Sequence, residues 1–296
     1  YFPRWAVDQN PGLGDCGYGF IRFCIEHPVS RSIMERYLRM IMPRLKGHPA
    51  LHSICLSNEP QYRDRCERSL ELFRDWLRRR FASVEQMNQQ CGTRVGSFAD
   101  ISLPEDDTFS PLLYLWAVFN QERFAGWHRW MADIIHEYAP DLPVHAKVMA
   151  RAFEGPEEFL KGVDHEEFAR LGEISGNDCV CQIPLEDMEP FEYGQSWLKQ
   201  AMYYDFQRSV APGQPIVNSE NHLIRDDTPV PVSGAHIYTS IWQGAIHGQG
   251  GHAIWVWERS EGRTTFDNIL TRAPCVEAAG RAGLDLLRCA AEVAPV

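Results

Sequence analysis

Two glutamates directly follow apolar, strand-like runs, and they are the residues whose types and positions most clearly suggest chemistry. Glu59 follows the run in "ALHSICLSNEP", and Glu220 follows the β-branched run in "PIVNSENH". Asparagine and glutamate form strands poorly and are rarely buried, so a fold that places them there exposes them at a strand end. Two carboxyl groups facing one another can hydrolyse a glycosidic bond, one of them as proton donor to the leaving oxygen. The sequence therefore predicts Glu59 and Glu220 as a catalytic pair.

The elements that must position these glutamates alternate short apolar runs with longer amphipathic segments, which is typical of βα units and a parallel sheet. In a closed barrel the carboxyl ends of all strands meet at one mouth, which would bring both glutamates there. Strands are predicted at residues 19–25, 50–57, 143–150, 177–183, 214–220 and 252–258. Helices are predicted at residues 31–46, 63–81, 83–90, 111–138, 193–210, 233–248 and 276–291.

Several boundaries follow from local signals. Ser30 or Ser32 is expected to cap the first long helix, and Gly47 to end it. Asn177 and Asp178 are expected to open the strand that follows them. The length of 296 residues is close to the roughly 250 of an α/β barrel. We expect one domain over residues 1–296, with residues 83–110 as an excursion at its edge.

Composition excludes several classes of partner. The net charge of −11 argues against nucleic acid, and the arginines between Arg74 and Arg80 are spaced as on a solvated helix face. No apolar run approaches the roughly 20 residues of a membrane helix, so no membrane partner is expected. The nine cysteines include no repeated C-x-x-C, and Cys179 and Cys181 would share one strand face. Reduced thiols are therefore expected, which favours a reducing compartment.

The motif "LSNEP", a later strand ending in Glu220 and the Trp-rich "IWVWER" together resemble the glycoside hydrolases of clan A. Those enzymes are retaining glycosidases with a (β/α)8 TIM barrel. The stretches "GHPALHSICLSNEP" and "LFRDWLRRRFASVEQMNQQCGT" are most similar to the β-galactosidases of family 42 and their relatives. The resemblance extends over about residues 19–260, and it implies an α/β fold of the (β/α)8 type for this chain.

The resemblance also implies roles for individual residues. Glu59 would be the general acid/base, Asn58 would bind the sugar 2-hydroxyl, and Glu220 would be the nucleophile. Trp257 would form an apolar floor under the sugar, with Trp255 as its partner on the same strand face. A retaining mechanism places the two carboxyl groups roughly 5 to 5.5 Å apart. It requires no metal and no organic cofactor.

Three further side chains are candidates for the substrate pocket. Lys147 shares a strand face with His145, so it could bind substrate hydroxyls or form a salt bridge inside a barrel. His222, two residues beyond Glu220, could line the pocket. Tyr193 could stack on a sugar or pack in the core.

The chain departs from the clan in one respect. Three strands precede the acid/base strand in that clan, and a βα unit with its returning strand takes about 30 residues. The residues before Glu59 hold only one convincing helix and one strand, so the first two barrel strands are expected to be missing. An open barrel exposes two sheet edges. We therefore expect a longer polypeptide, a covering segment or a homo-oligomer.

Three functional interpretations follow. The leading one is a retaining hydrolase of a β-linked sugar, with galactoside favoured by family likeness alone and a carbohydrate as the only expected ligand. The alternative is a non-catalytic carbohydrate-binding protein derived from such an enzyme. A metal-dependent barrel hydrolase ranks third, because that chemistry usually needs a close histidine pair and the sequence contains no H-x-H.

Overall fold

The structure is a computed structural model that describes residues 2–14, 19–103, 107–181, 190–224, 231–258 and 268–293. The chain forms two compact units, which are described separately. Unit 1 comprises Tyr1–Leu142 with Phe153–Glu167, and unit 2 comprises Pro143–Ala152 with Phe168–Val296. Within the described part of the chain, no helix is both long enough and apolar enough to cross a membrane.

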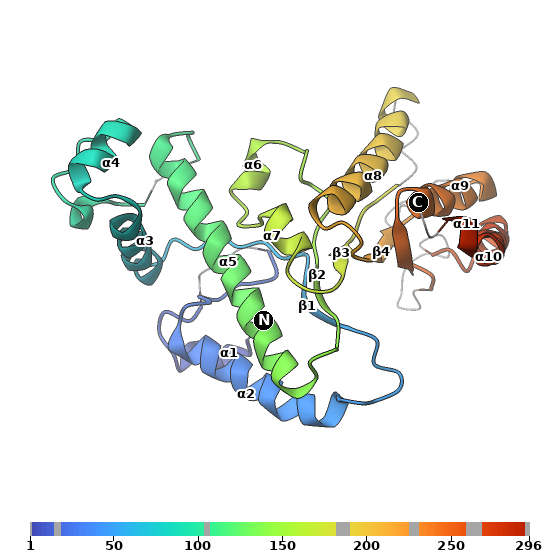
Figure 1. Ribbon diagram of the computed structural model, residues 1–296, viewed down its shortest axis with the longest axis horizontal. Helices are drawn as coiled ribbons and strands as arrows, with labels where there is room; N and C mark the ends of the chain where they lie inside the picture. The colour runs from blue at the N-terminus through green and yellow to red at the C-terminus, as the bar shows by residue number, and fades with distance from the viewer. Residues whose placement is uncertain are drawn as a thin grey trace. The chain divides into compact units, whose positions relative to one another are not determined.

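Unit 1 is mostly helical and is organised around the long helix α5 (Figure 1). Its elements are α1 (Arg4–Asp8), α2 (Pro28–Leu45), β1 (Ile54–Asn58), α3 (Glu67–Arg80), α4 (Val84–Cys91), the 3-10 helix η1 (Phe98–Asp100), α5 (Pro111–Tyr138) and α6 (Pro156–Phe159). The bounds of α5 confirm the helix predicted at residues 111–138. Ser110 caps it, because the Leu113 N–H donates to Ser110 Oγ at 3.1 Å, and Pro111 at the first helical position has no N–H that would need an acceptor.

The core of unit 1 joins α3, α4 and α5. The predicted excursion at residues 83–110 contributes α4 and η1, and Ser83 caps α4 through the N–H of Gln86. The buried cluster consists of Phe73, Trp76, Leu77, Phe81, Met87, Cys91, Ile101, Leu113, Leu115, Trp116 and Phe119. The excursion therefore packs its apolar residues against α3 and α5.

Two predictions for the N-terminal part of unit 1 are wrong. Residues 19–25 form turns and one isolated bridge rather than a strand, because the backbone donors pair outside any strand ladder: the Cys24 N–H donates to Leu13 O, and the Ile25 N–H donates to the Tyr62 hydroxyl. Most apolar side chains of this segment are buried, and Phe20 is exposed. The N-cap of α2 is His27, whose Nδ1 accepts from the Val29 N–H, while the Ser30 hydroxyl donates to Cys24 O.

The described residues of unit 2 form four parallel strands whose spatial order follows their order along the chain. They are β2 (Val144–Lys147), β3 (Ser175–Asn177), β4 (Ile216–His222) and β5 (Gln249–Trp255). Val148 bridges Asn177 in parallel, β3 pairs with β4, and β4 pairs with β5. Helices α8 (Pro190–Val210) and α9 (Gly234–Ile246) lie between successive strands in the sequence. This singly wound arrangement is that of a βα barrel wall.

Three strands of unit 2 match predicted ones with shifted bounds, whereas β3 shares only Asn177 with its predicted strand. The strand predicted at 177–183 begins at Ser175 and ends at Asn177, so Asn177 closes it, and residues 182 and 183 lie outside the described residues. The strand predicted at 252–258 begins at Gln249 and ends at Trp255. Cys179 and Cys181 are both buried with Val180 exposed between them, but they lie beyond the end of β3 and not on a strand face as predicted.

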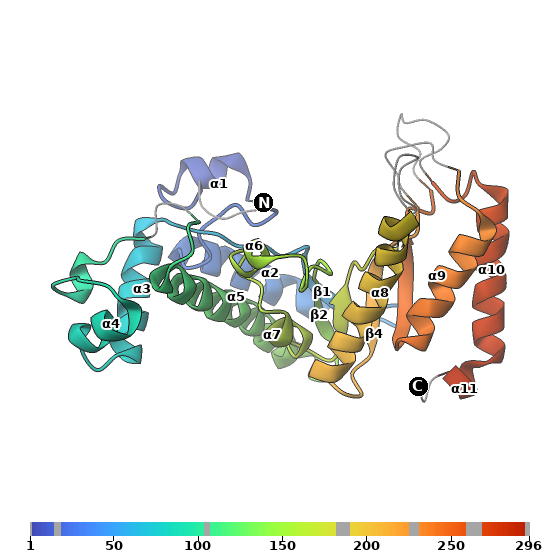
Figure 2. The same ribbon diagram turned by 90° about the horizontal axis from the view of Figure 1, so that it is seen from above.

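Apolar clusters among the described residues pack the helices of unit 2 together and against its strands. Helices α9 and α10 (Ala273–Arg288) lie side by side, with the short helix α11 (Ala290–Val293) beyond them (Figure 2). Their buried cluster consists of Leu223, Ile224, Ile237, Ile241, Ile269, Cys275, Ala278 and Ala282. The second cluster packs α8 against β4 and consists of Cys179, Tyr203, Tyr204 and Ile216. These clusters fix β4, which carries Glu220.

Candidate functional site

Unit 2 places Glu220 near the end of β4 between two basic side chains. Lys147 Nζ forms an ion pair with Glu220 Oε2, and His222 Nε2 lies 3.3 Å from Glu220 Oε1. The lysine side chain is 3 % exposed and the glutamate side chain 15 %. Charges attract more strongly where water is excluded, and a neighbouring cation favours the ionised carboxylate. The arrangement therefore favours the ionised form of the Glu220 carboxyl group.

A buried hydrogen-bond network fixes the backbone that carries Glu220. Asn218 Oδ1 accepts from the Glu220 N–H at 3.2 Å, and Asn218 Nδ2 donates to Cys179 O and to the hydroxyl of Tyr204. Gln249 Nε2 donates to the same hydroxyl at 3.0 Å. The pairing of β4 with β5 is irregular between Asn218 and Asn221, a feature that re-aims side chains at strand ends.

Burial raises the pKa of Tyr204 well above its usual value, so the phenol stays neutral. The neutral phenol oxygen accepts hydrogen bonds from the two amide groups without placing an uncompensated charge in the core. Asn218 is buried as well, and both its amide atoms are committed to this network. It thus supports the strand, a role that the residue pattern of "IVNSE" did not reveal.

The two tryptophans of the β5 region lie in different surroundings. Trp255 ends β5, is paired in register with His222, and has its ring centroid 6.0 Å from that of His222. Trp257 lies beyond the strand, is 40 % exposed, and its carbonyl accepts from the Leu270 N–H. Trp255 therefore belongs to the group around Glu220, and Trp257 offers an accessible ring.

Tyr193 lies in a separate cluster on α8 and α9. Its hydroxyl is 2.7 Å from His236 Nδ1, and its ring packs edge-on against Trp197. His236 Nε2 lies 3.0 Å from Leu223 O, so the imidazole donates there and accepts from Tyr193. Burial lowers the pKa of His236, which agrees with a neutral ring. Tyr193 is thereby held in one orientation.

Glu59 and Asn58 belong to unit 1, at the end of β1. Asn58 is exposed, and Glu59 is partly buried. Glu59 has φ +45°, in the left-handed region that residues with side chains adopt uncommonly. Such backbone is concentrated at functional sites. The sequence "NEP" therefore ends β1 in an unusual turn centred on the candidate acid.

Helix α5 anchors the residue before this turn. Ser57 Oγ lies 2.7 Å from His128 Nε2, and His128 Nδ1 lies 2.8 Å from Phe124 O. Full burial lowers the pKa of His128 to about 4, so the imidazole is neutral. The His128 ring donates a hydrogen bond to Phe124 O and accepts one from the Ser57 hydroxyl. The end of β1 is thus tied to the middle of α5, a link that the sequence did not indicate.

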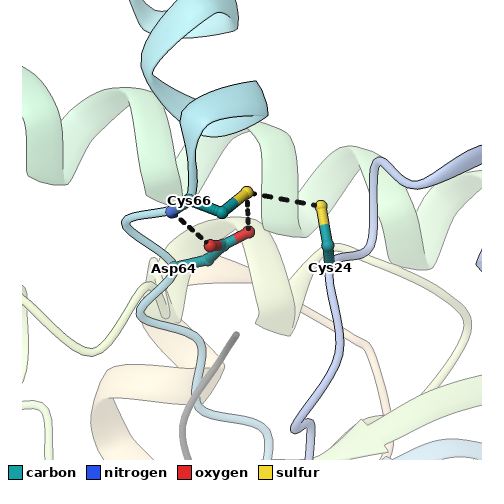
Figure 3. Close-up of side chains that lie close together, drawn as sticks. All are labelled: Cys24, Asp64 and Cys66. Carbon is teal, nitrogen blue, oxygen red and sulfur yellow. Dashed lines mark hydrogen bonds between the residues drawn. The ribbon is translucent and has the colours of Figure 1, made fainter. Parts of the chain in front are cut away.

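Among the described residues, one group of side chains in unit 1 could offer a metal ion three ligand atoms. Cys24, Asp64 and Cys66 place one donor atom each within 4.8 Å of one another (Figure 3). The Asp64 carboxylate already accepts from the Tyr62 hydroxyl, the Ser69 hydroxyl and the Cys66 N–H, each at 2.8 Å. Structural zinc sites use four ligands. Among the described residues this group offers one ligand fewer, and its side chains form a hydrogen-bonded cluster.

Relatives of known activity match most of the chain. The profile of a glycoside hydrolase family 42 described as beta-galactosidase matches residues 16–262. A beta-galactosidase of Thermus thermophilus is 24% identical over 283 residues, which cover 86% of this chain and 41% of that protein. The beta-galactosidase BgaB of Geobacillus kaustophilus is also 24% identical and covers 87% of this chain and 39% of its own length. The chain thus spans about two fifths of the length of these relatives.

Solved structures show the same fold. The apo exo-carrageenase of family 42 from Bacteroides ovatus has a TM-score of 0.85 at 23% identity, covering 99% of this chain and 44% of its own. The cold-adapted beta-galactosidase from Rahnella sp. R3 has a TM-score of 0.76 at 19% identity, covering 99% and 45%. The fold is therefore that of part of an α/β TIM barrel, as the sequence predicted. Because the family profile covers most of its residues, the chain belongs to glycoside hydrolase family 42.

Proposed function

We propose that the protein containing this chain is a retaining β-glycoside hydrolase of the β-galactosidase type. Family membership and the names of the curated relatives support this activity. The observation that carries the proposal is the state of Glu220, which lies near the end of a parallel strand as a carboxylate paired with Lys147 and close to His222. A nucleophilic carboxylate must be ionised before it reacts, and this environment favours that form.

In the first step Glu220 attacks the anomeric carbon, while Glu59 gives its proton to the glycosidic oxygen of the leaving group. Lys147 keeps Glu220 ionised in the resting state. Once the glycosyl ester forms, the charge on Glu220 is lost. The Lys147 ammonium then has no ionised partner in Glu220 and can donate to a substrate hydroxyl, as the sequence analysis suggested.

In the second step Glu59, now a carboxylate, takes a proton from water as the water attacks the anomeric carbon and releases Glu220. Asn58 donates to the sugar 2-hydroxyl in this scheme. Trp257 and Trp255 provide apolar surface under the sugar ring, since aromatic faces pack well against C–H groups. His222 and Tyr193 remain proposed as residues of the pocket wall.

Azide rescue tests the two roles separately. Glu59→Ala and Glu220→Ala in the complete protein should each lower kcat by about 10²- to 10⁴-fold or more on an aryl β-galactoside. Added azide should restore turnover in both, giving a β-glycosyl azide with Glu59→Ala and an α-glycosyl azide with Glu220→Ala. The matched control is Glu277→Ala, since Glu277 is an exposed carboxylate on α10.

An absence of rescue in both variants, with wild-type activity intact, would overturn the assignment. If the protein binds galactosides but hydrolyses none of the β-galactoside, β-glucoside and β-mannoside substrates, the alternative function applies. The protein would then be a non-catalytic carbohydrate-binding protein. Comparing kcat/KM for those three chromogenic substrates also tests the galactoside preference, which rests on the family alone.

A further inference from the structure

The thiols of Cys24 and Cys66 lie close enough to react with one another. Their Sγ atoms are 3.8 Å apart, with the Cys66 thiol directed at Cys24 (Figure 3). A disulfide has an S–S length of about 2.05 Å, so the sulfurs would have to approach by about 2 Å. Rotation about the two Cα–Cβ bonds moves a sulfur by distances of that size. The pair spans 42 residues of sequence, from the segment before α2 to the residue before α3.

Hydrogen bonds hold both backbones in place around the pair. On the Cys24 side, the Ser30 hydroxyl donates to Cys24 O at 2.7 Å. On the Cys66 side, the Cys66 N–H donates to Asp64 Oδ1 at 2.8 Å. The two sides are joined through Tyr62, whose hydroxyl accepts from the Ile25 N–H and donates to Asp64 Oδ2. These hydrogen bonds therefore hold the two thiols close together without a covalent bond between them.

The two thiols differ in access and in electrostatics. Cys24 is fully buried, whereas Cys66 is partly exposed and occupies the N-cap position of the 14-residue helix α3. A helix N-terminus favours a thiolate, which is the reactive form. The Asp64 carboxylate opposes it, because Asp64 Oδ2 lies 3.5 Å from the Cys66 sulfur. Cys66 is thus the point of entry, and its reaction should be slow at neutral pH.

We propose that Cys24 and Cys66 are a site of reversible oxidative modification, at which a low-molecular-weight disulfide such as oxidised glutathione converts the two thiols into an intramolecular disulfide. The Cys66 thiolate attacks one glutathione sulfur, forms a mixed disulfide and releases one glutathione thiolate. The Cys24 thiolate then attacks the Cys66 sulfur and displaces the second glutathione. Two protein thiols are oxidised, one glutathione disulfide is reduced to two glutathione thiols, and two protons pass from the protein to glutathione.

The cross-link would close a loop that contains α2 and β1 and would tie the segment before α2 to the loop that follows Glu59. Closing a long loop restricts the unfolded chain more than the folded one. Oxidation should therefore stabilise this part of unit 1. The proposal does not depend on the proposed hydrolase activity.

Peptide mapping of the complete protein tests the proposal without a mutation. The reduced, desalted protein is incubated with oxidised glutathione, alkylated with iodoacetamide and digested. We expect a linked peptide pair that joins Cys24 to Cys66, lighter by two hydrogens than the separate peptides and released by dithiothreitol. The rate of its formation should rise between pH 7 and pH 9, as the Cys66 thiol ionises.

Variants then test the order of the two steps. Cys24→Ser should accumulate the mixed glutathione disulfide at Cys66, and Cys66→Ser should leave Cys24 unmodified because it is buried. Cys55→Ser, which removes an exposed cysteine elsewhere in unit 1, should form the cross-link at the wild-type rate. Asp64→Asn should form it several-fold faster, because the opposing charge is gone.

Three outcomes would overturn the proposal. The first is that no cross-link forms between Cys24 and Cys66 in the wild-type protein at pH 9. The second is that either cysteine joins a different cysteine instead. The third is that the protein as purified holds one equivalent of zinc which protects both thiols until a chelator removes it, since the cluster would then be a metal site.

Discussion

At the scale of single residues, the ion pair of Glu220 with the buried Lys147 is expected to favour the ionised carboxylate. Lys147 and Glu220 form an ion pair with little exposure to solvent, and removing one partner of such a pair leaves an uncompensated buried charge. The sequence left Lys147 open between a substrate ligand and a salt-bridge partner. The ion pair is now established, and its role toward substrate stays a prediction. Alternation along a strand showed that His145 and Lys147 share a face, but not which residue of another strand they meet.

Lys147→Met should move the acidic limb of the kcat/KM profile to higher pH. The methionine keeps the apolar stem and removes the cation, so Glu220 binds its proton more readily. A change of one pH unit corresponds to about 1.4 kcal/mol, which is about tenfold in activity on the acidic limb. The pH dependence of kcat/KM on an aryl β-galactoside measures it, with Lys147→Arg as the control that retains the charge. An unchanged acidic limb in Lys147→Met would rule out this electrostatic role.

At the scale of elements, the helices were predicted more closely than the strands. The helices predicted at residues 111–138 and 83–90 correspond to α5 and α4, and the structure shows that Ser110 and Ser83 cap them. Residues 19–25 were predicted as a strand from their apolar run, and most of these side chains are indeed buried, yet their backbone groups bond within turns and loops. A pattern of apolar residues indicates which side chains are buried. It does not indicate the hydrogen-bond partner of each backbone N–H and C=O group. For the same reason the sequence did not reveal the links from Ser57 to His128 or from Asn218 to Tyr204.

Ser57→Ala tests whether α5 positions the turn that carries Glu59. The change removes the hydroxyl group that lies 2.7 Å from the buried His128 Nε2, and loss of a buried hydrogen bond should lower the free energy of unfolding by about 1 to 3 kcal/mol. Displacement of Glu59 should also lower kcat more than it changes KM. Urea unfolding and steady-state kinetics measure the two effects, with Ser97→Ala as an exposed control. Equal activity and stability in Ser57→Ala and Ser97→Ala would show that the link is dispensable.

At the scale of the molecule, the alternation of strands and helices predicted the fold class, and the family match agrees with it. The parallel strands of unit 2 follow chain order, as a barrel wall requires. The expectation of one domain over residues 1–296 stays a prediction, as does a covering segment or second copy. Both expectations depend on contacts between surfaces whose residues are far apart in the sequence or belong to another chain. Composition and periodicity do not encode such contacts.

Acid should destabilise both units through buried neutral histidines. Burial lowers the pKa of His128 in unit 1 to about 4 and lowers the pKa of His236 in unit 2. An unfolded histidine has a pKa of about 6.5, so below that pH the unfolded chain takes up protons that the folded chain does not. For His128 the free energy of unfolding should fall by about 1.4 kcal/mol per pH unit from about pH 6.5 to about pH 4.

Urea unfolding of the complete protein at pH 7 and pH 5 measures this loss. His128→Gln keeps a polar side chain that does not titrate, so it should show a shallower dependence on pH in this interval. A wild-type dependence in His128→Gln would mean that other groups account for the acid sensitivity.

The most direct test of the central claim is to trap the glycosyl-enzyme intermediate. A 2-deoxy-2-fluoro-β-galactoside with a good leaving group slows release of the sugar, so the nucleophile stays labelled and can be identified by mass spectrometry of the peptides. We predict that the label is on Glu220 in the wild-type protein and is absent in Glu220→Gln. A label on another residue, or steady hydrolysis of galactosides with no label at all, would contradict the assignment of Glu220 as the nucleophile.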